Sequence, residues 1–304
     1  MPSEFELIRR HFSRPARRAV LGVGDDAALL APAAGQELAV STDLLLEGRH
    51  FARGAEPRAL GHKALAVNLS DMAAMGASPR WATLALALPQ ADDAWLEAFA
   101  AGFYALAERF GVDLVGGDTT RGPLAVCVTI LGEVPAGEAL RRSGARPGDD
   151  LWVSGELGGA AYALAHPADP AAAKRLHEPE PRVALGERLR GVASAAIDVS
   201  DGFAQDLGHL LERSGVGAVV EYARLPKHRI ADAALERRCV LSGGDDYELL
   251  FAAPSARRAA LERLDGAPAL TRVGEIREAR DGLAILDAHG APLPVARGFD
   301  HFAA

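Results

Sequence analysis

Short apolar segments alternate with longer segments of helical periodicity, and this alternation constrains the fold more than any other feature of the chain. The clearest helix runs from Trp95 to Phe110, where large apolar side chains recur three or four residues apart and Gly111 stands at the C-cap position. Further helices are predicted over 5–12, from Pro57 to about Gly76, between 155 and 189, and from Asp201 to Gly215. Strands are predicted at 37–40, 82–88, 112–115, 124–131, 151–154, 195–199, 218–222, 247–251 and 283–286. This order predicts an α/β or α+β fold.

Composition changes at about Pro135, where a segment rich in Gly, Arg and Pro extends to residue 149. Pro147-Gly148 within it is a strong turn signal. A chain of 304 residues is long enough for two domains. We therefore predict an N-terminal domain over 1–137 and a C-terminal domain over 138–304. Gly-Gly-Asp occurs once in each half, at 116–118 and 243–245, and two such short copies leave an internal repeat as a hypothesis.

Charge and composition exclude several classes of protein. The net charge of −8 argues against a general nucleic-acid binder. The longest apolar run, around 83–88, is too short to cross a bilayer, and residues 1–10 have no apolar core of a signal peptide. The two cysteines, Cys127 and Cys239, form no metal-binding pair and suit a reducing compartment. We expect a cytoplasmic protein that binds neither membranes nor nucleic acids.

Aspartates gather at predicted strand ends, glycine turns and helix starts, where loops build binding sites. These are Asp25, Asp26, Asp43, Asp71, Asp118, Asp198, Asp201, Asp245 and Asp246. Converging carboxylates repel one another unless cations neutralise them, and sites made of oxygen atoms favour Mg²⁺ shared with phosphate. The pattern thus predicts a site for a metal and a polyphosphate. For a single aspartate, a turn or an N-cap is the simpler explanation. Asp71 is the exception, because it lies inside an apolar helix on the face of Asn68 and needs a partner there.

The segment from Asp198 to Gly202 joins the end of a predicted strand to the start of a predicted helix. The free N–H groups at such a helix start can bind phosphate, while the carboxylates hold its metal. An ordinary N-cap formed by Ser200 or Asp201 explains the same residues. The segment alone does not separate these interpretations.

The common nucleotide-binding motifs are absent. Gly22, Gly24 and Ala27 have the spacing of a dinucleotide fingerprint, but the aspartates between them would repel a pyrophosphate. There is no P-loop, because none of the three lysines, at 63, 174 and 227, follows a glycine, and the protein-kinase motifs are missing. An ATP site in this chain therefore uses neither a P-loop nor the protein-kinase motifs.

Several segments, taken together and in this order, resemble the thiamine-monophosphate kinase family. They are GVGDDAALL from 22, STDLLLEGRHF from 41, GHKALAVNLSDMAAMGASP from 61, GGDTTRGPL from 116, RSGARPGDD from 142, AIDVSDGFAQDLGHL from 196, LSGGDDYELLF from 241 and GFDHF from 298. The family belongs with aminoimidazole ribonucleotide synthetase and selenophosphate synthetase. The resemblance implies the two-domain PurM-like fold, with an N-terminal mixed-sheet domain that binds ATP and Mg²⁺ and forms homodimers, and a C-terminal α/β domain.

The resemblance also implies roles for individual residues. Mg²⁺ ions would be held by Asp26, Ser41, Thr42, Asp43, Asp71, Asp118, Asp198 and Asp201. ATP would be contacted by Tyr104, Gly117, Asp118, Arg142 and Ser200. Thiamine monophosphate would be contacted by His50, Asp245 and Phe299. The family often has Glu in place of Asp245, and Tyr or Trp in place of Phe299; these departures bear on substrate affinity. No residue is implied as a general base.

The implied reaction is phosphorylation of thiamine monophosphate by ATP to thiamine diphosphate, the last step in forming that coenzyme, by direct in-line transfer assisted by Mg²⁺. Two alternatives remain at this stage. One is another ATP-dependent synthetase of the superfamily, which acts on a different phosphorylated small molecule. The other is a protein that binds Mg²⁺ and nucleotide without turnover, although such a binder has no need of so many metal ligands.

Overall fold

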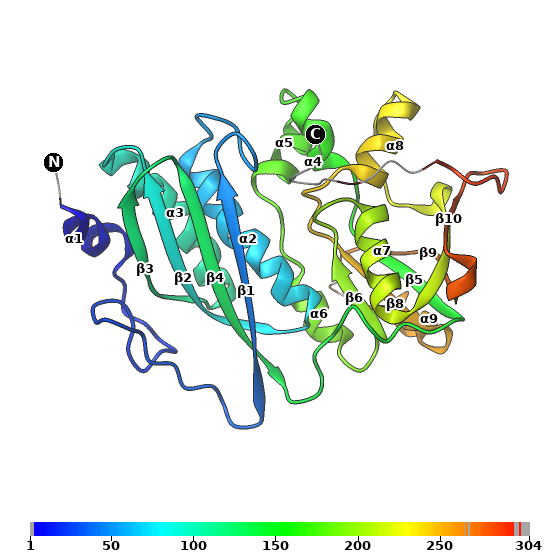
Figure 1. The fold of residues 1–304 in the computed structure, drawn as a ribbon, viewed down its shortest axis with the longest axis horizontal. Helices are drawn as coiled ribbons and strands as arrows, with labels where there is room; N and C mark the ends of the chain where they lie inside the picture. Colours follow the sequence, from blue (N-terminus) through cyan, green and yellow to red (C-terminus); the bar gives the residue numbers. More distant parts are fainter. Residues whose placement is uncertain (1–2, 265, 267, 295–297, 299–304) are drawn as a thin grey trace. The chain divides into compact units, whose positions relative to one another are not determined.

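The computed structural model describes residues 3–264, 266, 268–294 and 298. The chain forms two compact units (Figure 1). Unit 1 comprises Met1–Met72 and Ala77–Gly137, and unit 2 comprises Ala73–Gly76 and Glu138–Ala304.

Unit 1 is built on a mixed sheet of four strands in the order β1-β4-β2-β3. β2 and β3 are parallel, while β4 is antiparallel to both of its neighbours, β1 and β2. The elements are α1 (Glu4–Leu7), the π-helical turn η1 (Ile8–Phe12), β1 (Gln36–Leu46), α2 (Pro57–Ala74), β2 (Ser78–Leu88), α3 (Asp93–Phe110), β3 (Asp113–Arg121) and β4 (Ala125–Pro135). The mixed N-terminal sheet implied by the resemblance is therefore present.

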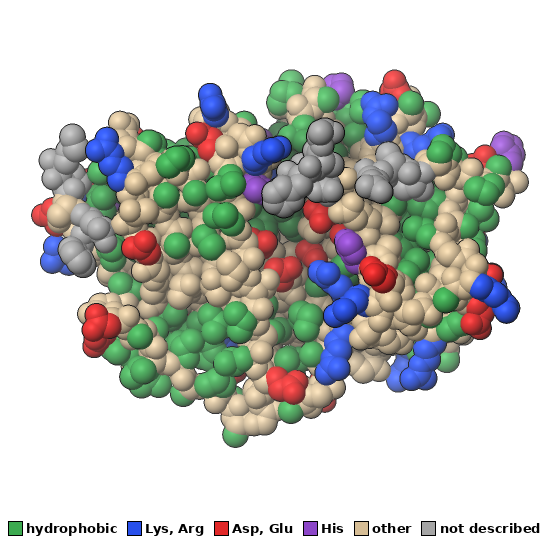
Figure 2. Space-filling view, viewed as in Figure 1, with side chains coloured by type: hydrophobic (Ala, Val, Ile, Leu, Met, Phe, Trp, Pro, Cys, Tyr) green, Lys and Arg blue, Asp and Glu red, His purple; other side chains and the backbone are tan. Residues whose placement is uncertain are grey.

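Helices α2 and α3 lie on one face of this sheet, behind the strands in Figure 1. Side chains alternate between faces along a strand, so Leu45 of β1 is buried under the helices while its neighbours point to the other face. On that open face, β1 exposes four large apolar side chains, namely Leu38, Val40, Leu44 and Leu46. Figure 2 views the molecule from the side of the open face.

The two helices approach each other closely because glycine stands at both contact points. A Cβ at Gly61 would lie 2.1 Å from the carbonyl oxygen of Phe99, and one at Gly102 would lie 1.8 Å from that of Arg58. The predicted apolar face of α3 is buried at Phe99, Phe103 and Leu106. Gly111 ends α3 in the left-handed conformation, as the sequence predicts.

Unit 2 contains a six-stranded mixed sheet in the order β10-β7-β9-β5-β8-β6. Its longer elements are β5 (Asp149–Ser154), α4 (Gly159–Ala165), α5 (Pro170–His177), α6 (Val183–Leu189), β6 (Ala195–Asp198), α7 (Phe203–Ser214), β7 (Val216–Glu221), α8 (Ala233–Ser242), β8 (Leu249–Pro254), β9 (Leu270–Glu278) and β10 (Leu283–Leu286). Short helical turns are η2 (Tyr222–Arg224), η3 (Ser255–Arg257), α9 (Arg258–Leu261) and η4 (Ala279–Asp281).

The core of unit 2 lies between this sheet and α7. The predicted apolar face of α7 is buried at Phe203, Leu207, Leu210 and Leu211. Two elements, α8 and β9, were not among the predicted ones. The strand pattern of β9 is obscured by Gly274 and by its charged residues. Helix α8, which follows the N-cap residue Asp232, has only a weakly apolar face. Within the described residues, no helix is long and apolar enough to cross a membrane.

Candidate active site

The predicted metal ligands of β1 divide between the two faces of the sheet. Ser41 and Asp43 have the orientation of the buried Leu45, toward the helices, whereas Thr42 is exposed on the open face. The Ser41 hydroxyl donates a hydrogen bond to Asp71 Oδ2 of α2 at 2.5 Å. Strand alternation and one hydrogen bond thus bring two separate motifs, STD and NLSD, together.

Asn68 lies one turn before Asp71 on α2 and is completely buried. Its side-chain nitrogen donates to the carbonyl oxygen of Ala64 at 3.1 Å, while its Oδ1 has no hydrogen-bond partner. A buried acceptor without a partner is rare and costs free energy. An oxygen that can accept a further bond is therefore built into the same helix face as Asp71.

The Gly-Gly-Asp motif of unit 1 lies within β3, not after it as the sequence suggested. The strand continues to Arg121 because Gly117 permits a very close approach to β2. A Cβ at Gly117 would lie 1.8 Å from the carbonyl oxygen of Leu84, and its φ of 149° disfavours other residues. The next residue, Asp118, pairs with Ala85 and is exposed on the open face.

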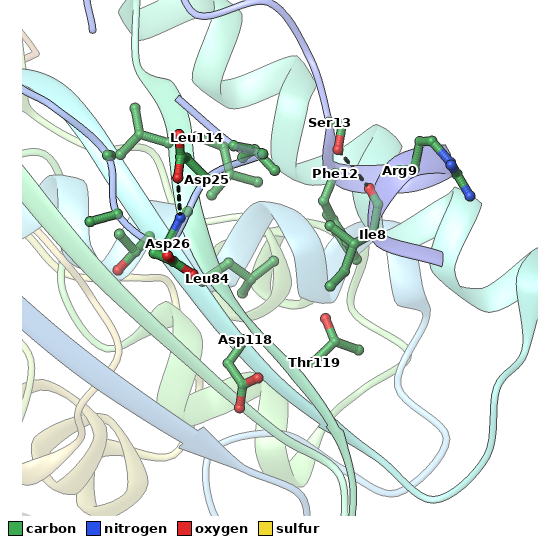
Figure 3. A pocket seen from close by; sticks show the side chains of 18 residues that line it. Ile8, Arg9, Phe12, Ser13, Asp25, Asp26, Leu84, Leu114, Asp118 and Thr119 are labelled. Carbon is green, nitrogen blue, oxygen red and sulfur yellow. Dashed lines mark hydrogen bonds between the residues drawn. The ribbon is translucent and has the colours of Figure 1, made fainter. Parts of the chain in front are cut away.

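A cavity of about 790 Å³ in unit 1 collects residues from four segments (Figure 3). Asp25 and Asp26 lie on one side of it, with Ile8 and Phe12 on the other. Residues 114–119 of β3, including Gly117 and Asp118, complete the wall with Thr83 and Leu84. Two of the predicted motifs, GVGDDA and GGDT, therefore share one cavity that has both apolar and acidic walls.

Tyr104, a predicted ATP contact, is buried and does not line this cavity. Its hydroxyl donates to the carbonyl oxygen of Phe12 at 2.8 Å, and the Arg14 guanidinium covers its ring at 3.6 Å. Burial raises the pKa of Tyr104 to about 12. Tyr104 thus holds Phe12, which does line the cavity.

His50, a predicted substrate contact, occupies the turn that follows β1. Its Nδ1 accepts a hydrogen bond from the backbone N–H of Leu46 at 2.9 Å. Its carbonyl oxygen accepts one from the buried Lys63 of α2 at 3.3 Å. Sequence reasoning missed the role of Lys63, although its position in the GHKALAVNLSD motif was a signal.

In unit 2, β6 ends at the buried Asp198, and Ser200 and Asp201 form the turn before α7. Three N–H groups of the turn before α7 are not free for phosphate, and the N-cap residue of α7 is Gly202, not Ser200 or Asp201. The backbone N–H groups of Ser200, Asp201 and Gly202 all donate to Asp206 Oδ2, at 3.0, 3.0 and 3.1 Å. Burial raises the pKa of Asp206 to about 7, and these bonds offset part of that rise.

The turn lies beside the second Gly-Gly-Asp motif, which carries Asp245. The backbone N–H of Asp245 donates to the Ser200 carbonyl oxygen at 2.9 Å, and that of Tyr247 donates to Val199 at 2.8 Å. Asp245 and Tyr247 are the two non-glycine residues with positive φ in the described part of the chain, at 67° and 50°. The Tyr247 hydroxyl donates to Asp245 Oδ1 at 2.8 Å. Such strained residues persist where their surroundings fix them, and they cluster at functional sites.

Buried charges anchor this loop to the rest of unit 2. Both carboxylate oxygens of Asp246 lie 2.9 Å from the Gly158 nitrogen, and burial raises the pKa of Asp246 well above its usual value. The buried Glu248 pairs with Arg182 through two bonds of 2.5 and 2.7 Å and also accepts from Ser154 at 2.6 Å. No sequence motif pointed to Arg182, which lies 66 residues from Glu248 in the chain.

Two predicted residues remain. Arg142 is exposed, and its carbonyl oxygen accepts a bond from Ser214. Phe299 lies outside the described residues. The candidate residues thus form one set in unit 1 and one in unit 2.

The donor atoms fit Mg²⁺ that is shared with phosphate. Among the described residues, no group of three or more His, Cys, Asp or Glu side chains could hold a metal ion alone. Mg²⁺ is usually held by one or two carboxylates together with substrate phosphates and water. The hydrogen-bonded Ser41 and Asp71, with the unpartnered Asn68 oxygen on the same helix, are donors of the required kind.

Comparison with known proteins defines the class. Residues 24–134 match the N-terminal domain of AIR synthase related proteins, and residues 146–286 match the C-terminal domain. Together the two domains define a two-domain protein of the AIR synthase superfamily, with the PurM-like fold.

Comparison with individual relatives identifies the family within this superfamily. The thiamine-monophosphate kinase of Salmonella typhimurium is 45% identical over 99% of this chain and 98% of its own. The crystal structure of thiamine-monophosphate kinase from Stenotrophomonas maltophilia has 46% identity and a TM-score of 0.83, covering 94% of this chain and 95% of that one. The structure described as AaThiL complexed with AMPPCP and TMP has 30% identity and a TM-score of 0.79, covering 90% and 89%. The chain belongs to the thiamine-monophosphate kinase family.

Proposed function

We propose that this chain transfers the γ-phosphoryl group of ATP to the phosphate of thiamine monophosphate, giving ADP and thiamine diphosphate. The observation that carries the proposal is the cavity of unit 1, because it joins Asp26 to Gly117 and Asp118 from a distant motif. The family relative solved with AMPPCP and TMP supports the choice of both substrates.

The reaction forms a bond between an oxygen of the acceptor phosphate and the γ-phosphorus. It breaks the bond from that phosphorus to the β–γ bridging oxygen, which leaves with ADP. The acceptor phosphate is largely a dianion at neutral pH, since its second pKa is about 6. It therefore needs no general base, and we assign none.

The residues proposed to contact ATP are Gly117, Asp118, Arg142 and Ser200. Gly117 and Asp118 lie next to each other in the cavity wall, where the proposal places the nucleotide. Ser200 offers a hydroxyl, and the exposed Arg142 offers a guanidinium suited to bidentate contact with phosphate. Tyr104 acts indirectly, because its hydrogen bond fixes Phe12 at the cavity.

Mg²⁺, when bound, supplies the charge neutralisation and alignment that let one phosphate approach another. The oxygen-bearing side chains proposed to hold several ions are Asp26, Ser41, Thr42, Asp43, Asp71, Asp118, Asp198 and Asp201. The Ser41 hydroxyl donates a hydrogen bond to Asp71, which brings both oxygens into one region of unit 1.

Thiamine monophosphate is proposed to contact His50, Asp245 and Phe299. The Asp245 carboxylate suits a cationic thiazolium, and its geometry is fixed by the Tyr247 hydroxyl. The His50 ring is oriented by the Leu46 N–H, which bonds to Nδ1 and leaves Nε2 as the other polar atom of the ring.

The test is ADP release from ATP and Mg²⁺, with and without thiamine monophosphate, with thiamine diphosphate resolved by chromatography. We expect equal amounts of both products and their loss on addition of a chelator. ATP consumption that ignores thiamine monophosphate would instead favour another synthetase of the superfamily. Inversion at a chiral γ-phosphorus is expected for direct transfer, and net retention would contradict it.

We also propose a cytoplasmic homodimer that forms through the open face of the unit 1 sheet. The exposed Val40 (59%) and Leu44 (50%) lie on this face. Light scattering should detect a dimer that Val40→Asp dissociates, whereas Leu164→Asp, at a more exposed leucine of unit 2 (72%), should leave it intact. An unchanged mass for Val40→Asp would contradict this interface.

A further inference from the structure

The start of α7 holds a buried carboxylate that the proposed reaction does not use. We infer that Asp206 is a positioning residue: through hydrogen-bond acceptance, it shapes the turn from Ser200 to Gly202 so that the side chains of Ser200 and Asp201, and not their N–H groups, are presented to ATP and its metal. This inference rests on the proposed function of that turn.

The geometry at the helix start is unusual for a cap. Gly202, directly before α7, has no side chain to cap the helix. Instead, Asp206 folds back from within the first turns of α7, and a single oxygen accepts three successive N–H groups. Asp206 is 3% exposed, so water does not compete for these donors.

A helix N-terminus attracts anions because its N–H groups and dipole point at the site. Here the Asp206 carboxyl group accepts hydrogen bonds from the turn that leads into α7, including the N–H of Gly202 directly before the helix. A nucleotide phosphate that approaches this turn meets the Ser200 hydroxyl, because the three N–H groups are already bonded.

The carbonyl groups of the turn and of the residue before it accept hydrogen bonds from backbone N–H groups. The Asp245 N–H bonds to the Ser200 carbonyl, and the Tyr247 N–H bonds to that of Val199. The Asp206 side chain thus binds the N–H groups of the turn. The loop that carries Asp245 and Tyr247 binds the carbonyl groups of Ser200 and Val199. Removal of the Asp206 side chain leaves the N–H groups of Ser200, Asp201 and Gly202 without this acceptor, so the turn is held only through its carbonyl groups.

A purely structural cap predicts a different outcome from a positioning residue. Loss of a purely structural cap lowers the temperature of thermal unfolding and leaves ligand affinity unchanged. Loss of a positioning residue displaces Ser200 and Asp201 and weakens binding of ATP, even in protein that remains folded.

The test compares Asp206→Ala, Asp206→Asn and Glu212→Ala. Glu212 is an exposed acid on the same helix and serves as the matched control. Binding of a non-hydrolysable ATP analogue is measured by calorimetry at saturating Mg²⁺, and thermal unfolding is recorded for each protein. For Asp206→Ala we expect affinity to fall about tenfold to hundredfold. Formate, which can occupy the vacated space and accept the same N–H groups, should restore it.

Asp206→Asn keeps an acceptor oxygen and should bind the analogue as Glu212→Ala does. The inference is overturned if folded Asp206→Ala binds the analogue like the control, or if folded Asp206→Asn loses affinity as severely as the alanine variant is expected to. Should Asp206→Ala not fold, the asparagine variant alone decides. Wild-type protein that forms no thiamine diphosphate would refute the proposed function, while the binding comparison would still test Asp206.

Discussion

The two sets of candidate residues are positioned by different means. In unit 1, they project from regular elements, so strand alternation in β1 and helix periodicity in α2 decide where Ser41, Asp43 and Asp71 point. In unit 2, Ser200, Asp201 and Asp245 lie in loops whose shape depends on backbone bonds and buried carboxylates. Regular elements fix direction with local rules, whereas loops need a supporting layer of other side chains.

The difference predicts that changes in unit 1 affect chemistry with little effect on folding, and that changes to the supporting layer of unit 2 affect folding or substrate binding. Each prediction below tests one side of this contrast.

The largest effect on activity is expected for Asp71→Asn. The substitution removes a carboxylate charge from a proposed metal site but keeps an atom of similar shape beside Ser41. We expect kcat to fall about a thousandfold, as for loss of a key electrostatic group in a reaction centre. Thermal unfolding should change little, and the Mg²⁺ dependence of the residual activity should shift.

Glu97→Gln is the control for Asp71→Asn, because Glu97 is an exposed acid on α3. It should leave both rate and Mg²⁺ dependence unchanged. A different result would assign Asp71 to stability: Asp71→Asn would be less stable than the wild type, while its folded fraction would keep the normal Mg²⁺ dependence. Such a result would contradict the proposed difference between the two units.

The largest effect on stability is expected in unit 2, for Arg182→Met. Glu248 is buried, and its carboxylate would lose the two bonds from Arg182. An uncompensated buried charge costs about 3 kcal/mol or more. Denaturant unfolding of Arg182→Met should show this loss. Arg224→Met breaks the exposed pair with Glu221 and should cost less than about 1 kcal/mol. Equal losses in the two variants would contradict a special role for the buried pair.

The elements that carry the unit 1 candidates were predicted in part. The helix of Asp71 and the cap at Gly111 follow from periodicity and local preference, which a single segment contains. The strand predicted at 37–40 stopped short of Ser41, which lies inside β1. The extension of β3 through Gly116 and Gly117 was missed, because it depends on the contact of Gly117 with Leu84.

In unit 2, the strand before Asp198 and the apolar face of α7 were predicted correctly. The same segment left the role of the N–H groups of Ser200 to Gly202 open, because their acceptor folds back from Asp206. Arg182 and Glu248 are 66 residues apart in the chain, and no local pattern reveals such a pair. The supporting layer of a loop is a tertiary property.

A smaller effect is expected for Tyr247→Phe, which removes the hydroxyl bonded to Asp245. The loss of one hydrogen bond is worth about 1 kcal/mol. We expect the KM for thiamine monophosphate to rise about fivefold with kcat nearly constant, because the bond orients a binding group and not the reacting atoms. Steady-state kinetics measure this. Tyr222→Phe removes a comparable bond to Glu236 and should leave KM unchanged. A kcat effect without a KM effect would argue against positioning of substrate by Tyr247.

The smallest effect tests whether unit 1 also depends on a partly buried ion pair. Glu133 of β4 accepts bonds from Arg80 of β2 at 2.8 Å and from the Ala33 N–H at 2.7 Å. Burial alone would raise the pKa of Glu133, but these bonds outweigh it, and the net pKa is lowered. A lowered pKa in the folded state contributes stability above the unfolded pKa, and this contribution is lost as pH falls through the folded value. Glu133→Gln should therefore lose about 1 kcal/mol at pH 7 and converge with the wild type in acid below about pH 4. Chemical unfolding at both pH values measures the difference. Convergence in acid would show that this ion pair links two strands of unit 1 and contributes modestly to stability. A loss of stability at pH 7 as large as that of Arg182→Met would contradict the proposed difference between the units, in which regular elements order unit 1 and buried charges order unit 2.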